Sequence, residues 1–266
     1  MQTEHLTQYL ETATELAHQA GRIMLEHFNN DVTVILKADN TPVTIADETI
    51  NQLVIDRICA QYPSHGVIGE EGSVERPDSA LQWVCDPIDG TLPYTLGIPT
   101  NVFSLAVTDG GDPIVAVVAD PYLGRIYTAT KGGGAFCDAS PIAVSTKDTF
   151  DGAIMNVSGR SGNNAAVLGG PLYADLEEMG GHMIHHSSMV YEAVMVASGK
   201  FDAAVFTKQT PWDAAAGALL VEEAGGKVTD VRGRSQRYDR PIAGTIFSNG
   251  ALHDAMERTA APHLIG

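Results

Sequence analysis

Basic residues are scarce in this 266-residue chain: 16 Lys and Arg stand against 33 Asp and Glu, a formal net charge of −17 at pH 7. Proteins that bind nucleic acids need a basic surface, because much of their affinity comes from displacing the cations around the phosphates. The same deficit of positive charge disfavours binding to anionic lipid. We therefore expect no nucleic-acid partner and no membrane partner.

Cysteines and long apolar runs are also scarce. Cys59, Cys85 and Cys137 are the only cysteines, and they form no C-x-x-C pair, which disfavours a disulfide framework and a thiolate metal site. No apolar run approaches the roughly 18 residues that span a bilayer, and residues 1–5 lack the basic and apolar pattern of a secretory signal. The sequence predicts a soluble protein of the reducing cytoplasm.

The chain nevertheless has enough apolar residues for a packed core, with 44% hydrophobic and 18% charged residues. Apolar residues at three- and four-residue steps predict an amphipathic helix over 3–28 and a second helix from Pro42-Val43 to Ile58. β-branched and apolar runs predict short strands at 32–36, 66–69 and 82–85.

The middle of the chain is typical of an antiparallel meander, with turns rich in Gly and Asp between strand-like runs at 102–108, 113–119, 125–130 and 135–144. Lys131-Gly132-Gly133-Gly134 lacks the G-K-[ST] sequence and the following helix of a phosphate-binding loop, and it predicts a hairpin turn. Strands and helices then alternate: strands at 153–157, near 183, at 201–206 and at 245–248, and helices at 164–179, 188–197, 211–224 and 251–259.

The acidic residues are concentrated: ten carboxylates lie between Asp39 and Asp89, against two arginines. Such a run is ordinarily a solvated face. Here, however, Glu70 follows one predicted strand, and Asp86 and Asp89 follow the next. In α/β proteins, side chains at strand ends line the crevices that bind ligands, so these three carboxylates are candidate site residues.

Two further carboxylates lie near helix starts. Asp47 is on the core-facing side of its predicted helix, and Asp213 follows Pro211-Trp212 at the start of another. Converging carboxylates repel one another unless cations neutralise them, and all-oxygen ligands suit Mg²⁺, Mn²⁺ or Ca²⁺ rather than zinc. Because Mg²⁺ leaves positions for water and phosphate, the pattern favours phosphoryl-transfer chemistry.

Thr91 adds a hydroxyl beside these acids. An acid such as Asp47 can orient or deprotonate that hydroxyl, and the amides of Gly90 and Thr91 can hold phosphate oxygens. Three histidines, His182, His185 and His186, have no cysteine nearby, and we interpret them as structural or surface residues, with His186 near the mouth of the site.

Four segments, in order and spanning essentially the whole chain, resemble the inositol monophosphatase family of Mg²⁺-dependent, lithium-sensitive phosphomonoesterases. They are Lys37 with Thr41-Pro42-Val43-Thr44 and Asp47; Gly69-Glu70-Glu71; Trp83-Val84-Cys85-Asp86-Pro87-Ile88-Asp89-Gly90-Thr91; and Pro211-Trp212-Asp213-Ala214-Ala215-Ala216-Gly217 with Glu223-Ala224-Gly225-Gly226.

The resemblance implies an α/β fold of alternating α/β/α/β/α layers, a sandwich of the sugar-phosphatase type with mixed and antiparallel sheets. It implies one unit over residues 1–266, in which an α+β half, 1–150, carries the metal site and an α/β half, 151–266, contributes Asp213. The resemblance also implies a homodimer.

The resemblance further implies two or three Mg²⁺ ions per site, with Mn²⁺ as an alternative ion. Glu70, Asp86 and the Ile88 carbonyl would hold the first ion, Asp86, Asp89 and Asp213 the second, and Glu70 with waters a third. Asp47 and Thr91 would activate the water that attacks phosphorus, the second ion would stabilise the leaving alkoxide, and no phosphoenzyme would form. Lys37 would balance charge at the edge, and Glu71 either supports the ligands or is solvated.

The substrate implied by the resemblance is a small phosphate monoester. The implied substrate-binding residues are Asp89, Gly90, Thr91, Ser158, Ser187, Ser188, Phe206 and Asp213. Phe206 stands where many inositol phosphatases have a glutamate that binds ring hydroxyls. Their Asn-Phe/Tyr-x-His segment is Pro93-Tyr94-Thr95-Leu96 here, and Met189 replaces a small residue. An apolar group cannot satisfy a substrate hydroxyl, so these differences leave the substrate open. The candidates are a polyol, cyclitol or sugar phosphate, histidinol phosphate, a nucleotide 3′-phosphate and fructose 1,6-bisphosphate.

Two other interpretations stay open. A phosphatase that forms a covalent aspartyl-phosphate has a D-x-D-x-[TV] segment, whereas the spacing here is Asp86-x-x-Asp89. Phe206 and Leu96 are also compatible with a non-catalytic, metabolite-binding protein of the same fold.

Overall fold

The computed structural model describes residues 3–28, 34–36, 42–158 and 168–265. Its larger sheet has seven strands in the order β3-β4-β5-β6-β7-β8-β9. β3 runs parallel to β4, and every other neighbouring pair is antiparallel, which confirms the predicted meander. The strands are β3 (Gly66–Gly69), β4 (Leu81–Asp89), β5 (Val102–Asp109), β6 (Asp112–Asp120), β7 (Arg125–Thr130), β8 (Gly134–Cys137) and β9 (Ser140–Pro141).

The smaller sheet has five strands in the order β11-β10-β12-β14-β13 and is mixed. β10 pairs in parallel with β11 and β12, whereas β14 pairs antiparallel with β12 and β13. Its strands are β10 (Ile154–Ser158), β11 (His182–Met183), β12 (Ala203–Phe206), β13 (Lys227–Asp230) and β14 (Thr245–Ser248). The boundary expected at residue 150 falls between the last strand of the larger sheet and the first strand of the smaller.

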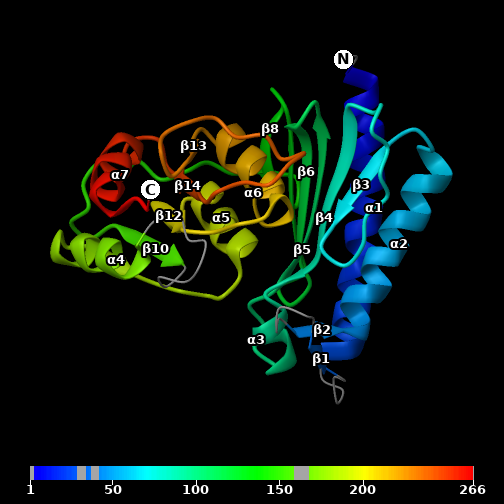
Figure 1. The fold of residues 1–266 in the computed structure, drawn as a ribbon, viewed down its shortest axis with the longest axis horizontal. Coiled ribbons are helices and arrows are strands. Elements are labelled where there is room, and N and C mark those ends of the chain that lie inside the picture. The colour runs from blue at the N-terminus through cyan, green and yellow to red at the C-terminus, as the bar shows by residue number, and fades with distance from the viewer. Residues whose placement is uncertain (1–2, 29–33, 37–41, 159–167, 266) are drawn as a thin grey trace.

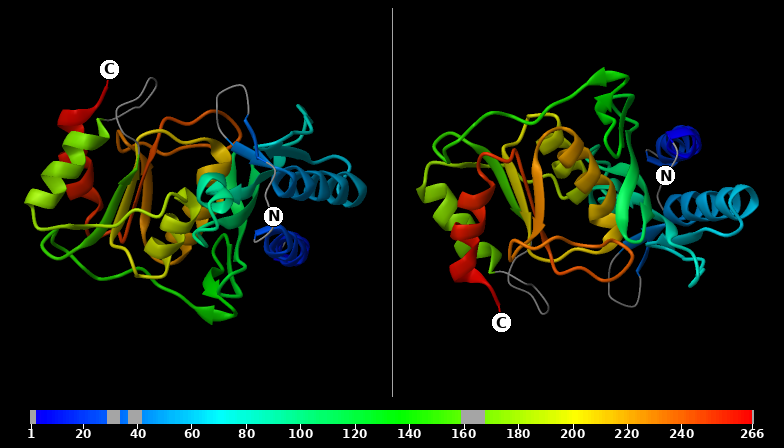
Figure 2. Two further views of the ribbon diagram at one scale, coloured as in Figure 1. Left: turned by 90° about the horizontal axis from the view of Figure 1, so that it is seen from below. Right: turned by 90° about the horizontal axis from the view of Figure 1, so that it is seen from above.

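Helices and sheets form five layers (Figures 1 and 2). α1 (Thr3–Phe28) and α2 (Ile45–Gln61) cover one face of the larger sheet, and α5 (Met189–Ala197) and α6 (Pro211–Glu223) lie between the two sheets. α4 (Gly169–Glu178) and α7 (His253–Ala260), with a 3₁₀ turn at Ala261–His263, cover the far face of the smaller sheet. This α/β/α/β/α order confirms the predicted fold class.

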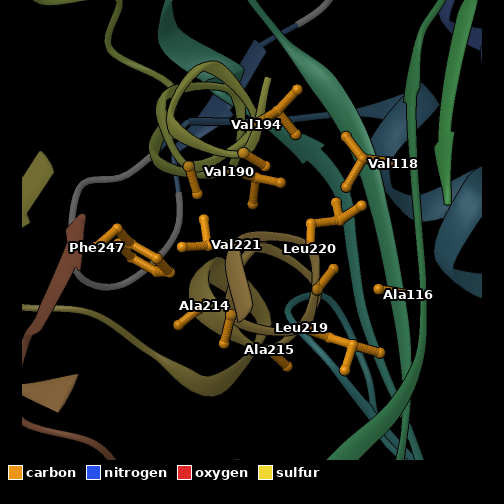
Figure 3. Close-up of a cluster of buried hydrophobic side chains, with 14 of the residues drawn as sticks. Ala116, Val118, Val190, Val194, Ala214, Ala215, Leu219, Leu220, Val221 and Phe247 are labelled. Atoms are coloured by element: carbon orange, nitrogen blue, oxygen red, sulfur yellow. The ribbon is translucent and has the colours of Figure 1, made fainter. Parts of the chain in front are cut away.

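The layer between the sheets holds a buried apolar cluster to which both halves of the chain contribute (Figure 3). α6 is buried on nearly all sides because residues 214–221 are Ala, Gly, Leu and Val, which is the pattern of a helix packed within a core. A Cβ at Gly217 would lie 2.6 Å from the Ala193 Cβ, so glycine permits the close approach of α5 and α6. This packing fixes α6, and with it Asp213, against the larger sheet.

Several predicted boundaries are wrong. Pro42–Thr44 is β2, which pairs antiparallel with β1 (Val34–Leu36), and the helix begins at Ile45 because Thr44 is its extended N-cap. The run over 135–144 is interrupted at Asp138 and Ala139, which both have positive φ. α3 (Thr91–Thr95) and β13 were not predicted, and residues 164–167 of the helix expected over 164–179 lie outside the described residues.

The glycine-rich turn at 131–134 joins β7 to β8, as predicted. The Gly132 and Gly134 amides donate to the Glu223 carboxylate at 2.7 and 2.8 Å. These amides therefore bind a carboxylate of α6 and hold the hairpin against that helix. None of the helices in the described part of the chain combines the length and apolarity needed to cross a bilayer.

Candidate metal centre

The end of β4 places two aspartates in one site. Asp86 pairs with Ser104 and Asp89 with Val102, so β4 has one extra residue between them, which is a β-bulge. Side chains three residues apart on a regular strand face opposite sides of the sheet. The extra residue of the bulge places the side chains of Asp86 and Asp89 on the same side. Pro87, which has no N–H to donate, occupies the bulge, where its missing hydrogen bond costs little. The bulge therefore turns Asp86 and Asp89 toward each other.

Asp213 reaches the same place from α6. It is the third residue of the helix, and its Oδ2 accepts from the backbone N–H and hydroxyl of the N-cap Thr210 at 2.7 and 2.8 Å. Carboxylate oxygens of Asp86, Asp89 and Asp213 lie within 4.8 Å of one another, and all three residues are buried. Residues far apart in the sequence thus form one compact acidic cluster.

Burial and mutual repulsion make this cluster hold protons tightly in the absence of cations. Burial raises the pKa of Asp89 to about 6, against hydrogen bonds from Ser188 and Val190 that lower it. Burial and the charge of Asp89 raise the pKa of Asp213 to about 7. Burial raises the pKa of Asp86 well above its usual value, with added repulsion from Glu70 and the other acids. Glu70, at the end of β3, is therefore close enough to act on the cluster.

The donor set fits hard divalent cations. Asp86 Oδ1 is buried and has no hydrogen-bond partner within the described residues, which is costly unless an ion or water occupies that position. Asp89 Oδ2 accepts from the Ser188 hydroxyl and, at 2.7 Å, from the Val190 amide, which fixes the orientation of this carboxylate. Oxygen ligands of this kind suit Mg²⁺ or Mn²⁺.

Asp47 and Thr91 lie together beside the cluster. Asp47 is the third residue of α2, and its Oδ2 accepts from the Thr44 amide at 2.9 Å and from the Thr44 hydroxyl. The Thr91 hydroxyl lies 3.3 Å from Asp47 Oδ1 and 3.1 Å from the Ile88 carbonyl oxygen. Asp47 is fully buried and Thr91 is half-buried, so the carboxylate meets a hydroxyl that solvent can reach. This is the arrangement that proton removal from a nucleophile needs.

The turn after β4 packs against the segment before α5. Gly90 has φ +92°, and a Cβ there would lie 3.2 Å from the Ser187 carbonyl oxygen. Ser187 itself has φ +61°, an uncommon conformation for a residue with a side chain. Ser188 is the N-cap of α5 and is almost fully buried, so its hydroxyl serves Asp89. Ser187 is exposed beside the Gly90 turn.

Glu192 is a further residue of the site that sequence reasoning missed. It is fully buried on α5, and it accepts from the Asn156 amide and from the His186 backbone N–H at 2.8 Å. Ser158 lies between Asn156 and His185, with its Oγ 3.2 Å from the His185 Nδ1. A single charged residue within the apolar run Met189-Val190-Tyr191-Glu192-Ala193-Val194 was the available signal.

Phe206 does not face this site. Its ring is fully buried and packs edge-on against Phe247, with centroids 5.7 Å apart, in the apolar layer between the sheets. The prediction that Phe206 binds substrate is therefore corrected: a phenyl ring at this position of β12 gains more from core burial. Lys37 lies outside the described residues.

The fold and site define a layered α/β protein with a buried cluster of carboxylates whose oxygen atoms suit divalent cations. A model of the inositol monophosphatase family matches residues 5–263. A histidinol-phosphatase from Chlorobaculum parvum is 32% identical over 250 residues, 93% of this chain and 94% of its own length. A fructose-1,6-bisphosphatase/inositol-1-monophosphatase from Aquifex aeolicus is 30% identical over 265 residues, 98% of each chain.

Among solved structures, the IMPase of Thermotoga maritima matches with a TM-score of 0.86 at 28% identity, covering 96% of this chain and 97% of its own. The chain therefore belongs to the inositol monophosphatase family, a family of Mg²⁺-dependent phosphatases, as its motifs indicated.

Proposed function

We propose that this chain is a Mg²⁺-dependent phosphomonoesterase that hydrolyses a small polyol, cyclitol or sugar phosphate to the alcohol and inorganic phosphate. The observation that carries the proposal is the convergence of Asp86, Asp89 and Asp213 within 4.8 Å, beside the Asp47 and Thr91 pair. Three charged carboxylates buried this close together repel one another unless bound cations neutralise them.

Two or three Mg²⁺ ions, with Mn²⁺ as an alternative, would be held by Glu70, Asp86, the Ile88 carbonyl, Asp89 and Asp213. When bound, these ions would neutralise the cluster, attract the anionic ester, lower the pKa of the attacking water and stabilise the leaving oxygen. The net charge of −17 is then no obstacle to an anionic substrate.

The residues of this chain would supply proton transfer and orientation. The attacking water would pass a proton to the Thr91 Oγ as the Thr91 hydroxyl passes its own proton to Asp47 Oδ1, its partner at 3.3 Å, and the leaving oxygen would take up a proton from solvent to give the alcohol. The contacts of Thr44 with Asp47 Oδ2 hold that carboxylate in place. The Gly90 and Thr91 amides would bind phosphate oxygens.

The named relatives support a phosphate ester more strongly than any one alcohol. One is named a histidinol-phosphatase and the other a fructose-1,6-bisphosphatase/inositol-1-monophosphatase, so similar chains act on different alcohols. The polyol, cyclitol or sugar assignment rests on the polar residues beside the Gly90 turn, Ser158, Ser187 and His185, which offer hydroxyl and imidazole groups.

Release of phosphate from a panel of esters tests the proposal. The panel holds inositol 1-phosphate, glucose 1-phosphate, fructose 1,6-bisphosphate, histidinol phosphate, a nucleoside 3′-phosphate and phenyl phosphate, each with Mg²⁺ and with EDTA. We expect release only with Mg²⁺, with the highest kcat/KM for a polyol, cyclitol or sugar phosphate. No release from any ester, with the protein folded and Mg²⁺ saturating, would overturn the proposal and favour a metabolite-binding role.

We further propose that the enzyme is a homodimer, is inhibited by Li⁺ and acts in the cytoplasm. These proposals rest on family membership and on the cysteine pattern. Light scattering after size exclusion measures the mass in solution, for which we expect twice 28.2 kDa. Addition of Li⁺ to the ester assay tests the inhibition, and a monomer or a Li⁺-insensitive enzyme would contradict the respective proposal.

A further inference from the structure

Next to the metal centre lies a cluster of polar residues that has no part in the catalytic steps above. Its buried base is formed by Glu192 and Asn156, which are 0% and 1% exposed. Its outer part is His185, whose side chain is 54% exposed, together with the hydroxyls of Ser158 and Ser187. Burying a carboxylate is costly unless hydrogen bonds satisfy it, so the partners of Glu192 matter for this cluster.

Glu192 organises the segment that leads into α5. Its Oε1 accepts from the His186 amide at 2.8 Å and lies 3.5 Å from the His185 Nδ1, and its Oε2 accepts from Asn156. The His185 Nδ1 also lies 3.2 Å from the Ser158 Oγ and 3.3 Å from the Asn156 Oδ1. One edge of the imidazole is thus fixed from three directions, which sets the direction in which the opposite edge points.

The opposite edge of the ring faces the exposed segment beside the Gly90 turn. The His185 Nε2 has the exposed Ser187 hydroxyl as its partner, at 3.2 Å, and a hydroxyl can rotate to release it. The Ser187 carbonyl packs over Gly90, and Ser188 holds Asp89, so this segment borders the phosphate turn. Ser187 has φ +61°, an uncommon conformation for a residue with a side chain.

We propose that His185 contacts the alcohol portion of the phosphate ester through Nε2 and determines specificity for it, and that Glu192 is the positioning residue that fixes the imidazole. This inference rests on the proposed phosphatase function and adds to it the residues that select the alcohol. Burial lowers the pKa of His185, so the neutral ring offers one donor and one acceptor, which match a hydroxyl. The buried Phe206 offers no polar atom for this purpose.

Kinetics of the His185→Ala variant test the proposal, with His182→Ala, an exposed histidine on β11, as the matched control. The measured quantity is the ratio of kcat/KM for the best polyol phosphate to kcat/KM for phenyl phosphate, which has no hydroxyl for His185. We expect His185→Ala to lower this ratio about tenfold, the value of one hydrogen bond, mainly through KM. The control should keep the ratio of the wild type.

The Glu192→Gln variant tests whether Glu192 positions the His185 ring or only stabilises the folded protein. We expect it to lower the same ratio, and we expect the double variant to be no worse than His185→Ala alone, because both changes remove one interaction. Additive losses, or equal losses on both esters, would overturn the positioning role. An unchanged ratio in His185→Ala would overturn the inference and leave the phosphatase function intact. The same holds if the wild type hydrolyses phenyl phosphate but no polyol phosphate. No turnover of any ester would overturn both.

Discussion

Asp47 and Asp213 occupy equivalent positions in two helices that lie on opposite faces of the larger sheet. Each is the third residue of its helix, each follows a threonine N-cap, and each uses Oδ2 to accept from the amide and hydroxyl of that threonine. The capping boxes satisfy donors that the helix starts would leave unpaired. They also fix both carboxylates, so that in Asp47 the other oxygen meets Thr91.

This relationship predicts that a cap residue affects metal binding. Thr210→Val removes the hydroxyl that donates to Asp213 and should destabilise the protein by about 1 kcal/mol in urea unfolding. It should also raise the Mg²⁺ concentration for half-maximal activity several-fold, because Asp213 loses part of its support. Thr210→Ser keeps the hydroxyl and serves as the control. An unchanged Mg²⁺ dependence in Thr210→Val would show that the cap does not position the ligand.

Asp86→Asn should inactivate and stabilise the protein at once. Asp86 Oδ1 has no hydrogen-bond partner within the described residues, and an amide there removes one of three repelling charges. Without metal at pH 8, we expect the free energy of unfolding to rise by about 1–3 kcal/mol, while phosphate release with Mg²⁺ falls at least about 100-fold. Asp78→Asn, at an exposed acid, is the control. A variant that is active, or less stable than the wild type without metal, contradicts the assignment.

Thr91→Val should lower kcat by about 100-fold or more, because it removes the hydroxyl between Asp47 and the Ile88 carbonyl. Thr91→Ser keeps the hydroxyl and should stay within a few-fold of the wild type. Steady-state kinetics at saturating Mg²⁺ measure both. If valine were tolerated as well as serine, the hydroxyl would have no part in proton transfer.

The metal-free protein should lose stability as pH rises. The pKa values of Asp89 and Asp213, about 6 and 7, lie above the usual 3.8, so between about pH 4 and 7 the native state binds more protons than the unfolded state. In EDTA, we expect Tm to fall by several degrees from pH 5 to pH 8, and saturating Mg²⁺ to restore it at pH 8.

Four histidines act in the opposite direction. Burial lowers the pKa values of His65, His185, His186 and His253, so their contribution to stability increases as pH rises toward 6.5. The histidines are the same in Asp86→Asn, so comparing the change in Tm of this variant with that of the wild type in the same buffers removes the histidine contribution. A wild-type Tm that fell no more than that of Asp86→Asn would contradict the repulsion argued here.

The elements that carry the site were predictable because local patterns define them. In β4, Asp86 follows a short apolar run, and the helix that contains Asp213 begins with proline and ends before two glycines. The bulge at Pro87 was not predictable from these patterns, since it depends on how β4 pairs with β5. α3 and β13 were missed because the first is five residues long with a central proline and the second is a short edge strand.

The residues proposed to contact the alcohol could not be predicted from local sequence patterns, for a different reason. The contacts of Glu192 with Asn156, and of His185 with Ser158, join residues 36 and 27 positions apart on separate elements of the second half. Phe206 shows the reverse case. A single position matched to a family motif suggested a substrate contact, whereas the register of β12 against β14 places its ring beside Phe247 in the core.

We infer that the carboxylates at the end of β4 and the start of α6 act by holding divalent cations for phosphate-ester hydrolysis. The most direct measurement is the rate of phosphate release by the wild type as Mg²⁺ is titrated into protein freed of metal with EDTA. We expect no release without the ion and a saturable rise in the rate as Mg²⁺ is added. Release at the same rate in EDTA and in Mg²⁺ would contradict this inference.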